Sequence, residues 1–117
     1  MTVRRSVMTL THPDMPDPIL LARIADRLRE RLGATRVIVY GSVARGQETI
    51  HSDIDLLVVA PTSDKAYLRM ATARASIRDL SFGVPISPLV LTPQEVALRL
   101  ERGDAFLQEI LDEGVDL

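Results

Sequence analysis

Two short apolar runs constrain the fold more than any other feature of this sequence. They read TRVIVY at 35–40 and DIDLLVVA at 53–60. Short runs rich in β-branched and apolar residues are typical of buried strands. Gly41-Ser42 ends the first run and Pro61 ends the second, and the polar GQETIHS before the second run indicates a loop. We therefore expect two neighbouring strands joined by a polar connection.

Helical patterns lie on either side of these strands. Asp17-Pro18 has the order of an N-cap followed by the first helical residue, and Gly33 provides a stop, which predicts a helix over 18–32. Ser63 could cap a second long helix. The apolar stripe of that helix should pack in the core: Ala66, Met70, Ala73, Ile77 and Leu80.

The last third of the chain adds one strand and two helices. The segment 84–91 is apolar but holds two prolines, which favours an edge strand or a bulge. Thr92 to Glu95 has the pattern of a capping box for a helix that ends near Gly103, and Asp104 can cap a last helix that ends at Gly114. Four residues of this last helix should face inward: Phe106, Leu107, Ile110 and Leu111. The element order predicts an α/β (α+β) domain with a small sheet.

Length and composition indicate one small cytoplasmic domain. We expect residues 1–16 to form an N-terminal arm, with a short strand around 7–10, and residues 17–117 to form the domain. The absence of cysteine excludes disulfides and thiolate metal sites and fits a reducing cytoplasm. No apolar run is long enough for a membrane span, and the start of the chain does not resemble a signal peptide. A net charge of −2 gives no bulk signal for nucleic-acid binding.

Two carboxylates, Asp53 and Asp55, stand at the start of the second apolar strand. Their i, i+2 spacing puts both side chains on the same face of the strand. Two neighbouring carboxylates repel each other, and burying them without a partner is costly. A divalent cation removes this cost, and Mg²⁺ commonly combines one or two carboxylates with substrate phosphates. These two residues are therefore candidate metal ligands and catalytic residues.

The Gly41-Ser42 pair is the second half of the candidate site. It follows a strand and could open a helical turn over 42–45, where free backbone N–H groups favour phosphate. Glycine permits close approach of a phosphate, and the Ser42 hydroxyl can donate to it. Gln47 stands where a Walker motif requires lysine. His12 and His51 are isolated in the sequence, which favours ordinary loop positions for both.

At these residues the chain resembles the nucleotidyltransferases of the DNA polymerase β-like superfamily. Their signature of Gly-Ser, about ten residues and Asp-x-Asp is present as Gly41-Ser42 and Asp53-Ile54-Asp55. The wider wording GSVARG…SDIDLLV is similar to the minimal nucleotidyltransferases of bacteria and archaea. In that group Arg45, Gly46 and Ser52 also match, and the resemblance extends over about residues 17–117.

The resemblance implies a nucleotidyltransferase fold with a small mixed sheet and flanking helices. It implies that Asp53 and Asp55 bind Mg²⁺, and that Gly41, Ser42, Arg45 and Ser52 bind the nucleotide. The implied reaction transfers a nucleoside monophosphate, AMP from ATP, to a hydroxyl of a protein or small-molecule acceptor. Many minimal members are antitoxins of toxin–antitoxin pairs, encoded beside a HEPN-type ribonuclease toxin that some of them adenylylate. A toxin protein is therefore an expected partner.

One position departs from the family pattern. Members usually carry a third carboxylate on the next core strand, and that place falls at or next to Ser87, with no Asp or Glu between Ser81 and Leu91. This departure leaves a second hypothesis open: a catalytically weak or inactive nucleotide-binding antitoxin or interaction module of the same fold. At this length we expect no second domain that would hold the acceptor. A partner, a second copy in a homo-oligomer or the open face of the sheet would have to hold it.

Overall fold

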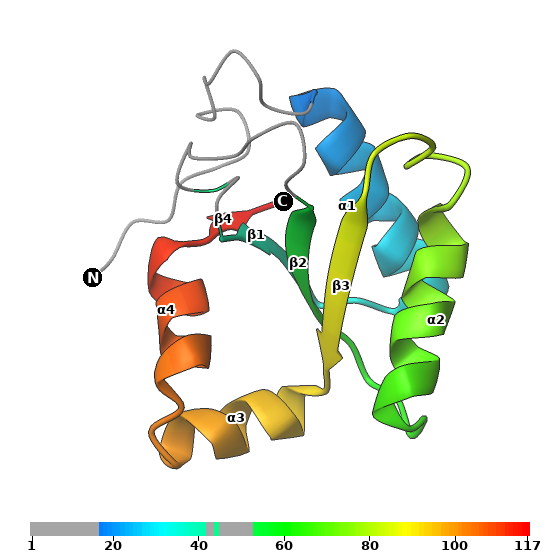
Figure 1. The fold of residues 1–117 in the computed structure, drawn as a ribbon. Helices are drawn as coiled ribbons and strands as arrows, with labels where there is room; N and C mark the ends of the chain where they lie inside the picture. The colour runs from blue at the N-terminus through cyan, green and yellow to red at the C-terminus, as the bar shows by residue number, and fades with distance from the viewer. Residues whose placement is uncertain (1–16, 42–43, 45–52) are drawn as a thin grey trace.

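A computed structural model describes residues 17–41, 44 and 53–117 of this chain. A four-stranded sheet with the strand order β3-β2-β1-β4 lies at its centre (Figure 1). Strand β2 is parallel to β3 and antiparallel to β1, so the sheet is mixed, as the sequence predicts. The elements in chain order are α1 (Pro18–Leu32), β1 (Arg36–Tyr40), β2 (Ile54–Val59), α2 (Ala66–Ile77), β3 (Ile86–Leu91), α3 (Pro93–Glu101), α4 (Ala105–Glu113) and β4 (Val115–Asp116).

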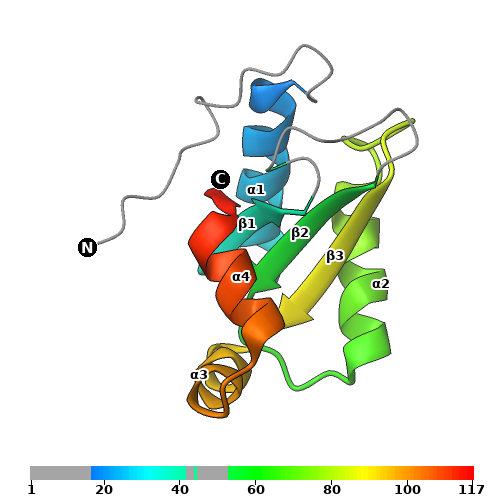
Figure 2. The ribbon, with the colours of Figure 1, turned by 60° about the vertical axis from the view of Figure 1, so that its left-hand side comes forward.

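Helices cover both faces of this sheet. Helices α1 and α2 lie on one face and α4 on the other, with α3 near the end to which β2 and β3 point (Figure 2). Alternation along β2 serves both layers, because Leu56 packs with α1 and α2 whereas Leu57 packs with α4. The core on the α1 and α2 side is the larger and includes Leu21, Ile24, Leu28, Val37, Val39, Ile54, Leu56, Val58, Ala73 and Ile77. The core under α4 includes Ile38, Leu57, Val59, Leu91, Leu107 and Ile110.

The predicted helix ends are confirmed at α1, α3 and α4. Asp17 accepts a hydrogen bond from the Ile19 amide at 2.8 Å, and Gly33 ends α1 in the left-handed conformation with φ 69°. The Thr92 side chain accepts from the Glu95 amide while Glu95 accepts from the Thr92 amide, which completes the capping box. Asp104 caps α4 through the Leu107 amide, and the helix ends before Gly114, as expected.

The prediction for α2 was partly wrong. The helix begins at Ala66 after Lys65, with no side-chain cap, so Ser63 does not cap it. Met70 is 36% exposed and is not a core residue, and Ala66 is also exposed. The reason is the rotation of the helix: the side facing the sheet carries Ala73, Ser76 and Ile77, and Arg69 extends from it toward the end of β3.

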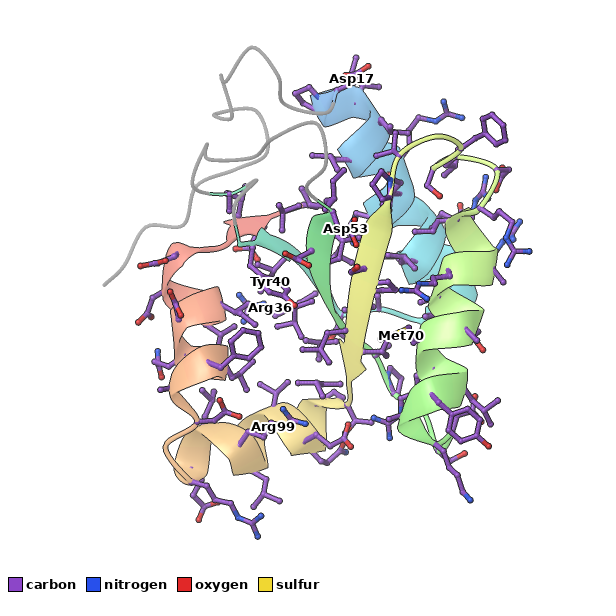
Figure 3. The ribbon with its side chains drawn as sticks, viewed as in Figure 1. Asp17, Arg36, Tyr40, Asp53, Met70 and Arg99 are labelled. Atoms are coloured by element: carbon purple, nitrogen blue, oxygen red, sulfur yellow. The ribbon has the colours of Figure 1, made fainter. Side chains whose placement is uncertain are left out.

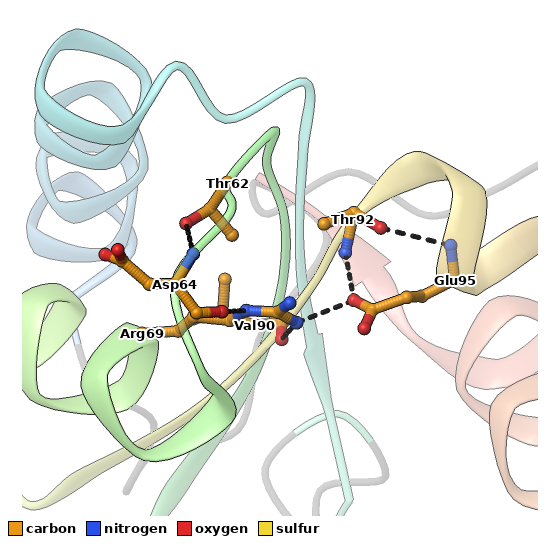
Figure 4. Close-up of polar contacts among 6 residues, drawn as sticks. All are labelled: Thr62, Asp64, Arg69, Val90, Thr92 and Glu95. Carbon is orange, nitrogen blue, oxygen red and sulfur yellow. Dashed lines mark hydrogen bonds and ion pairs between the residues drawn. The ribbon is translucent and has the colours of Figure 1, made fainter.

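Arg69 lies at the centre of a polar clamp beside the ends of β2 and β3 (Figure 4). Its guanidinium donates to the Asp64 carbonyl at 2.7 Å and to Oε1 of Glu95 at 2.6 Å, and lies 3.5 Å from the Val90 carbonyl. The same Glu95 oxygen accepts the Thr92 amide of the capping box. The Arg69 side chain is only 12% exposed. The clamp therefore connects α2, β3 and α3 through one cation.

Strand β3 lies at an edge of the sheet, as its prolines indicate. Pro88 pairs with Leu56 in the parallel register without breaking the strand. The opposite edge is β4, which the sequence did not predict. Val115 and Asp116 pair antiparallel with Val39 and Ile38 of β1.

Several expected features lie outside the described residues. They are the N-terminal arm over 1–16 with its strand around 7–10, the helical turn over 42–45, of which only residue 44 is described, the polar loop over 46–52, and the loop positions of His12 and His51. No helix in the described parts of the chain is both long and apolar enough to cross a membrane.

Candidate active site at the start of β2

The two carboxylates lie where β2 begins, at the end of the sheet away from α3. Asp55 is the second residue of β2, paired with Tyr40 of β1 on one side and with Ser87 of β3 on the other. Paired residues on neighbouring strands share a face, so all three side chains are on the α4 side. Asp53 directly precedes the strand (Figure 3). Asp53 precedes the paired residues, but it accepts a hydrogen bond from Ser87, which lies on that same face, as expected for two carboxylates that share one face.

Gly41 brings the backbone at the end of β1 against Asp55. It has φ 76°, a conformation that disfavours any residue with a Cβ. A Cβ added here would also lie 2.7 Å from Oδ2 of Asp55, closer than such atoms can approach. Glycine is therefore required twice, by the turn and by the carboxylate. This close approach is the contact between the Gly-Ser half and the Asp-x-Asp half of the predicted site.

The surroundings of Asp55 disfavour its charge. Burial raises the pKa of its carboxyl, and the neighbouring Asp53 raises it further. Burial, and then the negative charge of Asp55, raise the pKa of the Tyr40 hydroxyl as well. Among residues 17–41, 44 and 53–117, no Lys or Arg forms an ion pair with Asp53 or Asp55. Within that part of the chain, the fold concentrates negative charge here without neutralising it.

Ser87 touches the other carboxylate. Its Oγ donates a hydrogen bond to Oδ2 of Asp53 at 2.9 Å, across from β3 to the residue that precedes β2. The sequence predicted that the place of a third carboxylate falls at or next to Ser87, and the register places Ser87 directly beside Asp55. The third strand thus contributes a neutral hydroxyl at this point.

A cleft of about 260 Å³ opens beside Asp55, between the end of β1 and α4. Its wall on the helix side includes Phe106, whose ring meets that of Tyr40 edge-on at a centroid distance of 5.9 Å. Phe106 was expected to face inward, but it is 53% exposed and lies over this cleft. The cleft is lined by Tyr40, Gly41, Ala44, Asp55, Phe106, Glu109, Ile110 and Glu113.

This arrangement suits a magnesium ion that is shared with a phosphate ligand. The donors are hard carboxylate oxygens, and the close approach at Gly41 leaves backbone rather than a side chain beside them. No group of three His, Cys, Asp or Glu side chains that could hold a metal occurs among the described residues. Water or phosphate oxygens would therefore complete the coordination shell beside the protein oxygens found here.

Of the predicted site residues, the structure brings together Gly41, Asp53 and Asp55. Ser42, Arg45 and Ser52 lie outside the described residues. The sequence predicts neither the hydrogen bond from Ser87 to Asp53 nor the cleft wall that α4 contributes. The i, i+4 spacing of Glu109 and Glu113 is visible in the sequence, but nothing there shows that this side of α4 faces Asp55.

Comparison with known proteins adds three findings. Residues 21–117 match the family described as "Nucleotidyltransferase domain". A Methanocaldococcus jannaschii protein named "Putative protein adenylyltransferase" is 33% identical over 69 residues, which are 54% of this chain and 45% of that protein. The chain thus spans less than half the length of this relative. A crystal structure described as that of "a putative nucleotidyltransferase" from Sulfolobus solfataricus has a TM-score of 0.56 at 23% identity, covering 84% of this chain and 76% of the other, which shows a shared fold.

Proposed function

The chain belongs to the nucleotidyltransferase domain family; on that premise we propose that it transfers AMP from ATP to a hydroxyl of a protein acceptor. The observation that carries this proposal is the close packing of Gly41 against Asp55, with Asp53 two residues away. It puts carboxylates and an open backbone turn in one place, which is what a metal-bound triphosphate requires. The name of the Methanocaldococcus jannaschii relative supports AMP as the transferred group and a protein as the acceptor.

In the proposed reaction, the acceptor oxygen forms a bond to the α-phosphorus of ATP. The bond from that phosphorus to the β-phosphate oxygen breaks, pyrophosphate leaves and the acceptor proton is released. A Mg²⁺ ion bound at this site would offset the charge of the phosphates and of the attacking oxygen. Asp53 and Asp55 would hold that ion, and Ser42, Arg45 and Ser52 would bind the nucleotide. Gly41 keeps the backbone clear of side chains beside Asp55.

The cleft beside α4 is the route we propose for the acceptor. It opens directly onto Asp55, and the aromatic rings of Tyr40 and Phe106 form part of its wall. An aromatic wall suits a tyrosine side chain of a protein acceptor, because two rings can stack edge to face. The resemblance to minimal nucleotidyltransferases suggests a HEPN-type toxin as that acceptor.

One observation favours a second candidate function. The part of the chain that the structure describes supplies two carboxylates and a serine where relatives are expected to supply three carboxylates. A catalytically weak or inactive interaction module would need only the fold and the nucleotide pocket. Such a module would still bind Mg²⁺-ATP but would modify its partner slowly or not at all.

Labelled ATP separates the two functions. The purified chain, the product of the adjacent gene and Mg²⁺ are incubated with ATP labelled either at the α- or at the γ-phosphate. AMP transfer predicts that the α-label appears in protein and the γ-label does not, and that EDTA abolishes incorporation. Asp64→Asn, at the opposite end of β2, serves as the carboxylate control and should behave as wild type. Mg²⁺-dependent nucleotide binding without incorporation of α-label would instead establish the interaction module.

A further inference from the structure

We propose that Ser87 is a positioning residue that orients Asp53 for the cation, so that a neutral hydroxyl stands where a third carboxylate would add charge. The inference rests on the proposed function, since it concerns the metal-dependent binding of the nucleotide. It assigns a role to β3, which contributes no acidic residue to the site. Two observations support it.

The first observation is the direction of the hydrogen bond. The Ser87 Oγ lies 2.9 Å from Oδ2 of Asp53, and an ionised carboxylate can only accept, so the serine is the donor. The bond leaves the other carboxylate oxygen free to bind a cation. Ligand carboxylates in metal sites are typically held in this way by outer hydrogen bonds. The bond therefore selects one orientation of Asp53 without competing for the metal.

The second observation is the strand register. Ser87 is the direct neighbour of Asp55 across the parallel β2–β3 pair, yet its hydroxyl bonds to Asp53. Ser87 thus lies beside Asp55 in the sheet and forms its hydrogen bond with Asp53. Its hydroxyl can fix Asp53 while adding no negative charge next to Asp55.

The test measures nucleotide binding as a function of Mg²⁺, without catalysis. An α,β-methylene analogue of ATP is titrated calorimetrically into the full chain at increasing Mg²⁺. Ser87→Ala should raise the Mg²⁺ concentration for half-maximal binding by about 10- to 100-fold, the effect usual for loss of an outer-shell partner. Ser87→Thr keeps the hydroxyl and should stay close to wild type. Ser63→Ala, in the loop after β2, controls for loss of a serine elsewhere.

A double-mutant cycle makes the test specific to Asp53. Once Asp53→Asn has removed the carboxylate, adding Ser87→Ala should cause no further loss, because the hydroxyl acts through that carboxylate. Additive losses of Mg²⁺-dependent binding in the double variant would overturn the proposal. A Ser87→Ala protein with wild-type Mg²⁺ dependence would overturn it too. So would a Ser87→Ala protein that binds the analogue less tightly at every Mg²⁺ concentration, including in the absence of Mg²⁺. Binding that never depends on Mg²⁺ in the wild type would overturn it as well. Failure of AMP transfer with this pattern intact would defeat the proposed function and leave the role of Ser87 standing.

Discussion

The carboxylates near the two ends of the parallel strands β2 and β3 have opposite electrostatic surroundings. Near the C-terminal ends of these strands, Glu95 of α3 accepts hydrogen bonds from the guanidinium of Arg69 at 2.6 Å and from the backbone amide of Thr92 at 2.8 Å. Near the N-terminal end of β2, Asp53 and Asp55 lie close together, and within the described parts of the chain the neutral Ser87 hydroxyl is the hydrogen-bond donor to Asp53. The consequences for pKa are opposite: the Thr92 amide and then Arg69 lower that of Glu95, whereas burial and then Asp53 raise that of Asp55.

This difference separates structural charge from functional charge. A carboxylate that is paired with cations and hydrogen-bond donors of its own protein stabilises the fold and has few free acceptor positions for a ligand. A carboxylate held in its charged form at a cost is suited to bind a partner from outside, and such groups gather at functional sites. A perturbed pKa alone would have singled out both ends, because ion-pair networks perturb pKa values as well. The direction of the shift distinguishes them.

The largest expected difference between the carboxylates at the two ends of the sheet is in their effect on catalysis. Asp53→Asn and Asp55→Asn should each reduce α-label transfer by about 100-fold or more, the range seen when one preorganised charge-stabilising group is removed. Glu95→Gln, the same change of carboxylate to amide at the other end, should leave transfer unchanged. Equal losses in the three variants, measured at a temperature where all are folded, would remove the functional distinction between the two ends.

The next effect is on stability. Arg69→Ala should lower the free energy of unfolding by about 1–3 kcal/mol, because it removes charge-assisted hydrogen bonds from a mostly buried side chain. Arg74→Ala, on the exposed side of the same helix, should change it by no more than about 0.5 kcal/mol. Urea denaturation measures both. Should Arg69→Ala prove as harmless as its control, the clamp would not be a stabilising network.

Gly41 and Gly103 form a matched pair for testing the Gly-Ser turn. Both have φ 76°, but an added Cβ meets Asp55 at Gly41 and nothing within 4 Å at Gly103. Gly103→Ala should therefore cost about 1–2 kcal/mol for the left-handed backbone alone. Gly41→Ala should cost at least as much and should also weaken Mg²⁺-dependent nucleotide binding, because Asp55 must move. Normal nucleotide binding by Gly41→Ala would show that the position of Asp55 is not critical.

The smallest expected effect is a pair of opposite pH profiles. Asp55→Asn should stabilise the free protein slightly at neutral pH, by less than about 1 kcal/mol, and the gain should vanish below pH about 3.9, where the carboxyl is protonated in both states. Glu95→Gln should destabilise the protein at neutral pH. That loss should shrink as the pH falls below about 4.3 and through the lowered folded pKa of Glu95. Thermal unfolding across this pH range measures both, and profiles of the same sign would contradict the comparison.

Local chemistry made much of the fold predictable. The caps at Asp17, Gly33 and Thr92 depend on residues within a few positions of each other, and the structure has all three. Strand β4 could not be predicted, because two residues carry no periodic signal and their partners in β1 are far away in the sequence. The start of α2 was misjudged for the opposite reason: Ser63 offers good local capping chemistry, but the chain turns into the helix two residues later.

The candidate site also has one feature that local sequence predicts and others that depend on tertiary packing. The shared face of Asp53 and Asp55 follows from the period of a strand and needed no structure. The bond from Ser87 depends on the register between β2 and β3, which the packing of the whole domain determines. The position of Phe106 over the cleft depends on how α4 crosses the sheet, and helical periodicity alone assigned it to the core.

The pairing of β4 with β1 has a consequence for synthesis on the ribosome. Arg36 and Asp116 form an ion pair across 80 residues of sequence, and the Leu117 amide donates to the Val37 carbonyl at 2.9 Å. Until residues 115–117 emerge, the strand that leads into Gly41 has one unpaired edge, and free edges invite wrong pairing. A nascent chain that lacks these residues would thus expose one edge of the strand that leads into Gly41, and such unpaired edges make folding intermediates prone to aggregation.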